Sequence, residues 1–269
     1  MPAPPLPTFL VIGAPRCATR WLRTNLIEHP QVFMPPFDVD FFDHGSRYRR
    51  GGEEWYRLKF DAWEGEPCVG ESSPGYLAPR HQPHTMAERM YDMLPDVRLV
   101  ALVRHPVDRM YSAMFQEVRQ GRLPADADLF TMVTERHPDV AALELVDAGR
   151  YAKNLYPYWR LFGDQLLVVF HDDVRTQPQQ VYDAVVRHIG ASADFVPSHL
   201  DEVLFSSRTT LRYSGPRPTE EQFRILYGIF RDDIDELEAM LGLDLSRWDP
   251  GAPQAPAAPT GAWFEAPVT

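Results

Sequence analysis

The stretch from Thr8 to Leu22, TFLVIGAPRCATRWL, constrains the fold more than any other part of the chain. It opens with an apolar, β-prone run over 9–12, turns through Gly13-Ala14-Pro15 and can begin a helix at Thr19. A buried strand that leads through a tight turn into a helix N-terminus makes an anion site, because the turn amides point at the ligand and the helix dipole favours negative charge. Arg16 adds a positive charge. We therefore expect this turn to hold a phosphate or sulfate group of a nucleotide.

Short apolar strands alternate with helical segments along the rest of the chain. The strand expected over 98–104, RLVALVR, is continuously apolar, as in a parallel sheet covered on both faces. Further strands are expected over 68–71 and 165–170, and helices over 19–28, 84–93, 106–120, 150–161, 178–189 and 219–241, with one or two more within 126–147. This alternation predicts an α/β fold, a P-loop-like three-layer domain with a mainly parallel central sheet flanked by helices. Ligands of such sheets bind at the carboxyl ends of the strands, where the polar residues of 13–20, 71–73 and 104–112 are expected to converge.

Three segments lack a clear period. Residues 1–7 are Pro-rich and predicted to be flexible, and the Pro/Ala-rich tail 249–269 is predicted to be extended or disordered. Residues 31–61 are predicted to be irregular, and a loop of that length inside a domain is usually functional. The folded domain is therefore expected to span 8–248.

Charge and composition exclude several classes of protein. The net charge is −11, which argues against a nucleic-acid partner. The only lysines are Lys59 and Lys153, so a buried anion clamp must use Arg, His or backbone groups. The two cysteines, Cys17 and Cys68, fit a reducing compartment. The N-terminus lacks the pattern of a signal peptide, and no apolar run approaches the ~20 residues of a membrane span. We therefore expect a cytoplasmic protein with no membrane partner.

The turn at 13–19 is not a Walker A loop. Gly13 is followed by APRCAT, so the second Gly and the Lys of that motif are missing. A nucleotide-binding, kinase-like P-loop enzyme consequently remains only an alternative.

The motifs do resemble the sulfotransferases that use 3′-phosphoadenosine 5′-phosphosulfate (PAPS). The segment 13–22 is similar to the family's strand–loop–helix that binds the 5′-phosphosulfate, with Arg16 where the family usually has Lys. The segment 104–112, RHPVDRMYS, is similar to its second motif, an Arg after a core strand and a Ser on the next helix that both contact the 3′-phosphate. The resemblance implies PAPS, with 3′-phosphoadenosine 5′-phosphate (PAP) as product. It also implies cofactor contacts from Ala14, Pro15, Arg16, Cys17, Ala18, Thr19, Arg20, Arg104, Ser112 and, as the best match to a C-terminal element, Arg212.

Two further segments resemble the heparan-sulfate-type branch of the family. The segment 38–43, DVDFFD, is similar to Glu-x-x-Phe-Phe, whose Glu is the proposed catalytic base; Asp38 is therefore the expected base, with His44 and His105 as alternatives. The segment 71–76, ESSPGY, is similar to Glu-Lys-Thr/Ser-Pro-x-Tyr, with Ser where the branch has its Lys. The acceptor is expected to contact Phe42, Glu71, Ser72, Tyr76 and Tyr151.

These resemblances predict in-line transfer of a sulfuryl group from PAPS to a hydroxyl of a sugar or small natural product. Such a transfer depends on positioning and on cationic stabilisation, as phosphoryl transfer does. Arg16 would stabilise the leaving phosphate and Asp38 would take the acceptor proton. Because the leaving phosphate is already a stable anion, no metal is expected. A non-catalytic nucleotide-binding protein of the same fold stays an alternative, and association into a homodimer is left open.

Overall fold

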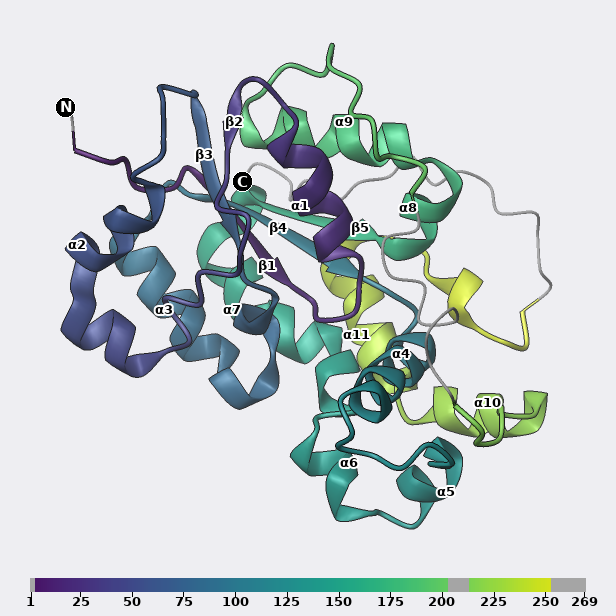
Figure 1. Ribbon diagram of the computed structural model, residues 1–269. Helices are drawn as coiled ribbons and strands as arrows, with labels where there is room; N and C mark the ends of the chain where they lie inside the picture. Colours follow the sequence, from purple (N-terminus) through teal and green to yellow (C-terminus); the bar gives the residue numbers. More distant parts are fainter. Residues whose placement is uncertain (1–2, 203–212, 253–269) are drawn as a thin grey trace.

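Five parallel strands form the central sheet of the computed structural model, which describes residues 3–202 and 213–252. The sheet order is β2-β3-β1-β4-β5 (Figure 1). The strands are β1 (Phe9–Gly13), β2 (Val32–Phe33), β3 (Cys68–Ser72), β4 (Arg98–Val103) and β5 (Leu166–Phe170). All four strand pairs are parallel, and every residue of β1, β3 and β5 is buried. The predicted parallel α/β fold is confirmed.

Helices cover both faces of this sheet and produce three layers (Figure 1). One face carries α1 (Thr19–Ile27) and α9 (Pro178–Ile189), while the other carries α3 (Pro83–Met93) and α7 (Tyr151–Phe162), with α11 (Arg231–Leu241) packed on α7. The remaining helices are α2 (Gly52–Arg57), α4 (Pro106–Arg119), α5 (Leu129–Thr134), α6 (Pro138–Ala142), α8 (His171–Thr176) and α10 (Glu220–Gly228). Short helical turns, labelled η, occupy several of the connections. None of the helices in the described ranges is long and apolar enough to cross a membrane.

The central position of β1 sets the place of the ligand site. The chain leaves β1 toward β2 and β3 on one side and later returns to β4 and β5 on the other. The turn after β1 consequently lies where the strand order reverses, at the crevice where open α/β sheets bind their ligands. Close packing fixes the register: Phe9 pairs with Gly70 on β3, and a Cβ on Gly70 would lie 2.3 Å from the ring of Phe9.

Two expectations about elements are wrong. The single helix expected over 219–241 is two helices, α10 and α11, because the chain bends at Ile229 and the fully buried Phe230. Apolar residues continue at helical spacing through Leu226, Phe230 and Ile234 across this bend, so the periodicity does not reveal it. The segment 31–61 is not irregular throughout, since it contains β2, α2 and the turns η1 (Arg47–Gly51) and η2 (Leu58–Phe60).

The predicted domain boundaries at residues 8 and 248 stay predictions, and the structure shows contacts near both. At the N-terminal end, Arg57 donates a 2.7 Å hydrogen bond to the carbonyl of Pro4, and Leu6 packs against the core. At the other end, the last described element is η7 (Ser246–Trp248), which closes with Trp248 buried. Most of the Pro/Ala-rich tail lies outside the described residues.

Candidate active site

The turn between β1 and α1 has an unusual backbone conformation. Arg16 and Ala18 have φ angles of 73° and 72°, in the left-handed region that residues with a Cβ rarely occupy. Ala18 is the N-cap of α1 and no side chain caps that helix. Ala18 has no polar side chain that could cap the amides of the first helical turn, and an uncapped helix N-terminus suits an anion. Such strain at a ligand-facing turn is typical of functional sites.

Two amides of this turn are used inside the protein. The amide of Ala14 donates to the carbonyl of Leu102 at 2.7 Å, and that of Cys17 donates to the carbonyl of Ala14 at 3.2 Å. The side chain of Cys17 is 0 % exposed. The cofactor contacts of Ala14 and Cys17 stay predictions, and the two amides themselves are bonded within the protein. Pro15 and Arg16 remain partly exposed at the tip of the turn.

Arg16 reaches across the sheet edge to the helix that follows β4. Its Nε donates to Oγ of Ser112 at 3.2 Å, and its Nη1 donates to Oε1 of Gln116 at 3.5 Å. Ser112 and Gln116 lie one turn apart on α4. The structure thus brings together two predicted cofactor residues that stand 96 positions apart in the sequence.

Arg104 and Arg109 complete a group of cations at this edge. Both Nε atoms are buried and have no hydrogen-bond partner among the described residues. One Nη of Arg109 donates to the carbonyls of Leu145 and Glu144. Among the residues that the structure describes, neither of these two guanidinium groups nor that of Arg16 forms an ion pair with a carboxylate. Clustered cations without carboxylate partners favour a bound anion.

The pKa of Arg16 reports the same crowding of positive charge. Burial lowers this pKa most, and the neighbouring Arg119, Arg104 and Arg109 lower it further. An anion placed among these groups would reverse the second effect, because an opposite charge favours the ionised guanidinium. The electrostatics of the site therefore favour an occupant with several negative charges.

Tyr151 connects the turn after β1 with the residue that follows β4. Its hydroxyl lies 3.5 Å from Sγ of Cys17 and accepts a 3.3 Å hydrogen bond from the amide of Arg104. Burial raises the pKa of both Tyr151 and Cys17, so both groups stay neutral. Tyr151 is 1 % exposed and joins the turn after β1 to the start of the segment after β4, so its contact with the acceptor stays a prediction.

The acidic loop at 38–43 contacts the residues that follow β3. Asp38 is exposed and forms an ion pair with Arg23 of α1. Asp40 is partly buried, and burial raises its pKa, followed by the charges of Asp43 and Asp38. This loop therefore offers an exposed, ion-paired carboxylate, Asp38, and a partly buried one with a raised pKa, Asp40.

The two histidines considered as alternative bases have structural contacts. The exposed His44 pairs with Oγ of Ser46 at 2.8 Å. His105 is buried, its Nε2 lies 2.9 Å from the carbonyl of Trp248, and burial lowers its pKa. His105 is thus committed to the packing around Trp248.

Four predicted acceptor contacts lie in the core instead. Phe42, Glu71 and Tyr76 are 0 % exposed and Ser72 is 1 % exposed. Their contact with an acceptor stays a prediction, and in this structure they pack within the core. Phe42 packs edge-on against Tyr76, and Tyr76 donates to the carboxylate of Glu71 at 2.8 Å.

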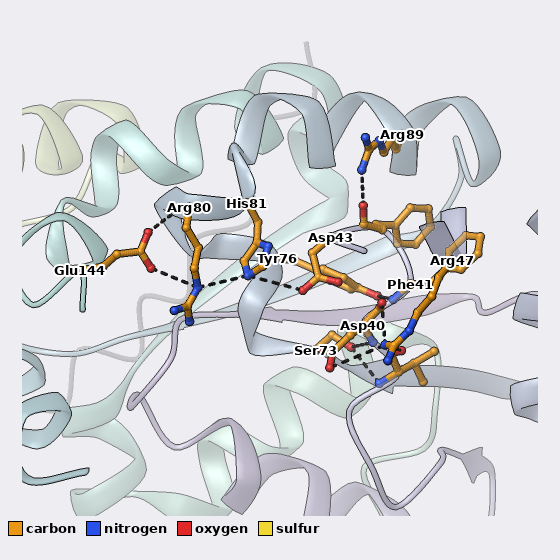
Figure 2. A network of polar contacts seen from close by, with 12 residues as sticks. Asp40, Phe41, Asp43, Arg47, Ser73, Tyr76, Arg80, His81, Arg89 and Glu144 are labelled. Atoms are coloured by element: carbon orange, nitrogen blue, oxygen red, sulfur yellow. Dashed lines mark hydrogen bonds and ion pairs between the residues drawn. The ribbon is translucent and has the colours of Figure 1, made fainter. Parts of the chain in front are cut away.

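A pocket of about 460 Å³ opens beside the turn. Its walls come from the turn, from α4, from the segment around η4 (Pro79–His81) and from the chain before α7. The lining residues are Pro15, Arg16, Arg80, Arg109, Ala113, Glu117, Arg122, Leu143, Glu144 and Ala148. Figure 2 shows Arg80 turned toward Glu144, and its Nε lies 3.4 Å from Oε2 of that residue.

Sequence reasoning missed the charged walls of this pocket. Arg109 could have been found, since it precedes Ser112 by three positions and so shares its helical face. Arg80 and Glu144 carry no such signal, because they are 64 positions apart and meet only in the folded chain. Arg212 lies outside the described residues. Within those residues, no three His, Cys, Asp or Glu side chains gather as they would around a metal ion.

The comparison with protein families decides which family this site belongs to. Residues 6–213 match the sulfotransferase domain family. The chain is a member of the sulfotransferase family. The matched range contains the turn after β1, the acidic loop and the Arg104–Ser112 segment.

Individual sulfotransferases agree with that assignment. The crystal structure of a sulfotransferase from Alicyclobacillus acidocaldarius superposes with a TM-score of 0.74 at 28% identity, covering 91% of this chain and 99% of that one. Heparan sulfate glucosamine 3-O-sulfotransferase 5 of Mus musculus is 32% identical over 117 residues, 44% of this chain and 32% of the relative. The bifunctional heparan sulfate N-deacetylase/N-sulfotransferase 4 of Mus musculus is 27% identical over 205 residues, 71% of this chain and 23% of the relative. The matches thus span a third or less of these curated relatives.

Proposed function

We propose that the protein transfers a sulfuryl group from PAPS to a hydroxyl of a sugar or small natural-product acceptor. The observation that carries this proposal is the meeting of Arg16 with Ser112 at the crevice of the sheet, beside two guanidinium groups whose buried Nε atoms lack partners among the described residues. Membership of the sulfotransferase family supports the choice of reaction.

The residues present suit the donor. PAPS supplies the sulfuryl group together with a 5′-phosphate and a 3′-phosphate. The N-terminus of α1, which Ala18 does not cap with a side chain, would hold the 5′-phosphate together with the hydroxyl of Thr19, and Arg20 stays a proposed contact. Arg104 and Ser112 would hold the 3′-phosphate, and the orphaned Nε of Arg104 is a donor that a phosphate oxygen would satisfy. Arg212 stays a proposed contact from outside the described residues.

Arg16 and Asp38 would carry the chemical step. Asp38 would accept the proton of the acceptor hydroxyl, whose oxygen forms the new bond to sulfur. The electron pair of the broken bond stays on the 5′-phosphate oxygen, where Arg16 would stabilise the added charge. Arg23 pairs with Oδ1 of Asp38, so Oδ2 is the oxygen that would accept the proton. Asp40 is the second candidate in the same loop, and its raised pKa suits a base.

The pocket beside Arg16 supports a polar acceptor. Its pairs Arg80–Glu144 and Arg122–Glu117 offer both hydrogen-bond donors and acceptors, as hydroxyl groups require. Its size suits a small molecule or one or two sugar units. The heparan sulfate enzymes among the relatives also support a sugar acceptor. The expected cytoplasmic location and the homodimer remain predictions.

Calorimetric titration with PAP tests the donor site directly. We expect binding in the wild type, a loss of at least ~30-fold in affinity for Arg104→Ala, since truncation of a charged buried donor costs about 2–5 kcal/mol, and a smaller loss for Ser112→Ala. Arg16→Ala should lower turnover far more than PAP affinity. Wild-type protein that fails to bind PAP would refute the proposal.

Turnover separates the proposal from its rivals. [35S]PAPS is offered with a panel of glucosamine, N-acetylglucosamine, p-nitrophenol and an alkyl alcohol. Binding of PAP without turnover of any acceptor favours a non-catalytic nucleotide-binding protein. Turnover that requires Mg²⁺ and ATP favours a kinase-like enzyme. Comparison of Asp38→Asn with Asp40→Asn in the acceptor reaction identifies the base, because only loss of the base removes the acidic limb of the pH profile.

A further inference from the structure

A buried carboxylate lies directly beneath the acidic loop. Glu71 is 0 % exposed at the end of β3, and no Lys, Arg or His of the described ranges forms an ion pair with it. Three hydroxyl groups donate to it instead: Tyr56 at 2.6 Å and Tyr76 at 2.8 Å to Oε1, and Ser73 at 2.6 Å to Oε2. A buried acid is costly to keep, so this arrangement points to a specific role.

Two of the three hydroxyls pass the contact on to the backbone of the acidic loop. Ser73 Oγ accepts from the amides of Val39 at 3.1 Å and Asp40 at 2.9 Å, and the Tyr76 hydroxyl accepts from the amide of Phe41 at 2.9 Å. Figure 2 shows Ser73 and Tyr76 turned toward this backbone. Because both hydroxyls donate their proton to Glu71, their lone pairs are left to face the loop. The Glu71 carboxylate therefore makes both hydroxyls act as hydrogen-bond acceptors toward the amides of the loop.

The loop is also held from its other side. Nη1 of Arg47 donates to the carbonyls of Val39 at 2.9 Å and Asp40 at 3.0 Å. The ring of Phe41 stacks on Tyr56 with 4.2 Å between centroids. The amides of 39–41 and the carbonyls of 39 and 40 are therefore all hydrogen-bonded, which restrains the backbone that carries Asp38 and Asp40.

We propose that Glu71 is a positioning residue for the catalytic base of the loop, acting through the hydroxyls of Ser73 and Tyr76. The inference rests on the proposed function, in which Asp38 or Asp40 accepts the acceptor proton. A general base displaced by about 1 Å loses much of its effect, because the reaction requires aligned atoms.

The chain offers a matched control for this role. Tyr56 and Tyr76 are both 0 % exposed and both donate to Oε1 of Glu71, yet only the Tyr76 hydroxyl accepts from the loop. Each Tyr→Phe change removes one buried hydroxyl and one hydrogen bond to the same oxygen. A difference between the two variants at the loop therefore reports the positioning contact and not the loss of a buried polar group.

Hydrogen exchange of single backbone amides, measured by NMR, tests the positioning itself. We expect Ser73→Ala to speed exchange at Val39 and Asp40 and Tyr76→Phe to speed it at Phe41, each by about fivefold or more, while Tyr56→Phe changes none of the three. Glu71→Gln should speed exchange at the loop as well, because the NH₂ group donates where the carboxylate accepted. Unchanged exchange in Glu71→Gln, or equal effects of the two Tyr→Phe variants, would overturn the inference.

Turnover then links the loop to catalysis. With the acceptor that the panel identifies, Ser73→Ala and Tyr76→Phe should lower kcat by roughly tenfold or more while the KM for PAPS and PAP affinity stay constant. Tyr56→Phe should keep kcat within about twofold. Equal kcat in all three variants would overturn the catalytic part. If the wild type turns over no acceptor, the proposed function fails, whereas the exchange data still decide whether Glu71 positions the loop.

Discussion

At the scale of single residues, the turn after β1 is built against the preferences of its own side chains. Arg16 and Ala18 take positive φ angles that a glycine would adopt without cost. The sequence shows that glycines are absent here, and it cannot show which residues must adopt the left-handed conformation. That information comes from the backbone path between β1 and α1.

Ala18→Gly should therefore stabilise the protein. A left-handed conformation costs a residue with a Cβ roughly 1–2 kcal/mol, and the greater freedom of glycine in the unfolded chain offsets part of this gain. We expect the unfolding free energy in urea to rise by about 0.5–1 kcal/mol. Ala141→Gly, at an exposed position inside α6, is the control and should lower it by about 1 kcal/mol. Two equal losses would contradict the argument.

Glu71 predicts a pH dependence of stability. Burial is the main cause that raises its pKa from an ordinary 4.5 to about 7. The folded chain therefore binds the proton more tightly than the unfolded chain, so this stabilising contribution is complete below about pH 4.5 and is lost as the pH rises through 7. The expected loss is on the order of 3 kcal/mol.

Urea denaturation between pH 4.5 and 8 measures this effect in the wild type and in Glu71→Gln. The difference between their unfolding free energies isolates Glu71, because all other titrating groups are common to both proteins. We expect the wild type to lose stability relative to Glu71→Gln across this range. Parallel curves would mean that Glu71 does not titrate there.

At the scale of elements, local signals predicted what local sequence determines. The units β1–turn–α1 and β4–α4 were correct because each strand is continuously apolar and each helix begins at a recognisable position. The bend between α10 and α11 and the two-residue strand β2 were missed, since tertiary packing decides both. The convergence of Arg16 with Ser112 followed from the parallel sheet, whereas the Glu71 cluster depends on Tyr56, which no motif singled out.

At the scale of the whole molecule, bulk charge and site charge have opposite signs. The chain carries a net charge of −11, yet Arg16, Arg104, Arg109 and Arg119 lie close enough at one sheet edge to influence one another. Composition could exclude a nucleic-acid partner as an expectation, and it could not reveal this concentration of guanidinium groups. The fold creates the site by bringing α4 against the turn after β1.

Trp248, near the C-terminal end of the described chain, is part of the folded core. Trp248 is 1 % exposed, its ring lies 5.7 Å from Phe170 and 6.3 Å from Tyr151, and its Nε1 donates to Asp172 at 3.0 Å. It therefore seals the carboxyl edge of the sheet beneath Arg104. We expect a chain ending at 245 to lose about 3–5 kcal/mol of unfolding free energy, as a large buried aromatic does when it is removed, and to lose PAP binding.

A chain ending at 252 provides the matched comparison, because it keeps Trp248 and removes only Pro/Ala-rich sequence. Its unfolding free energy should stay within about 0.5 kcal/mol of the full chain, with PAP affinity retained. Trp248→Ala in the full-length chain should reproduce most of the loss seen at 245, which attributes the effect to this side chain rather than to chain length. If the chain ending at 252 is as unstable as the one ending at 245, the folded unit extends into the tail and the predicted boundary at 248 is wrong.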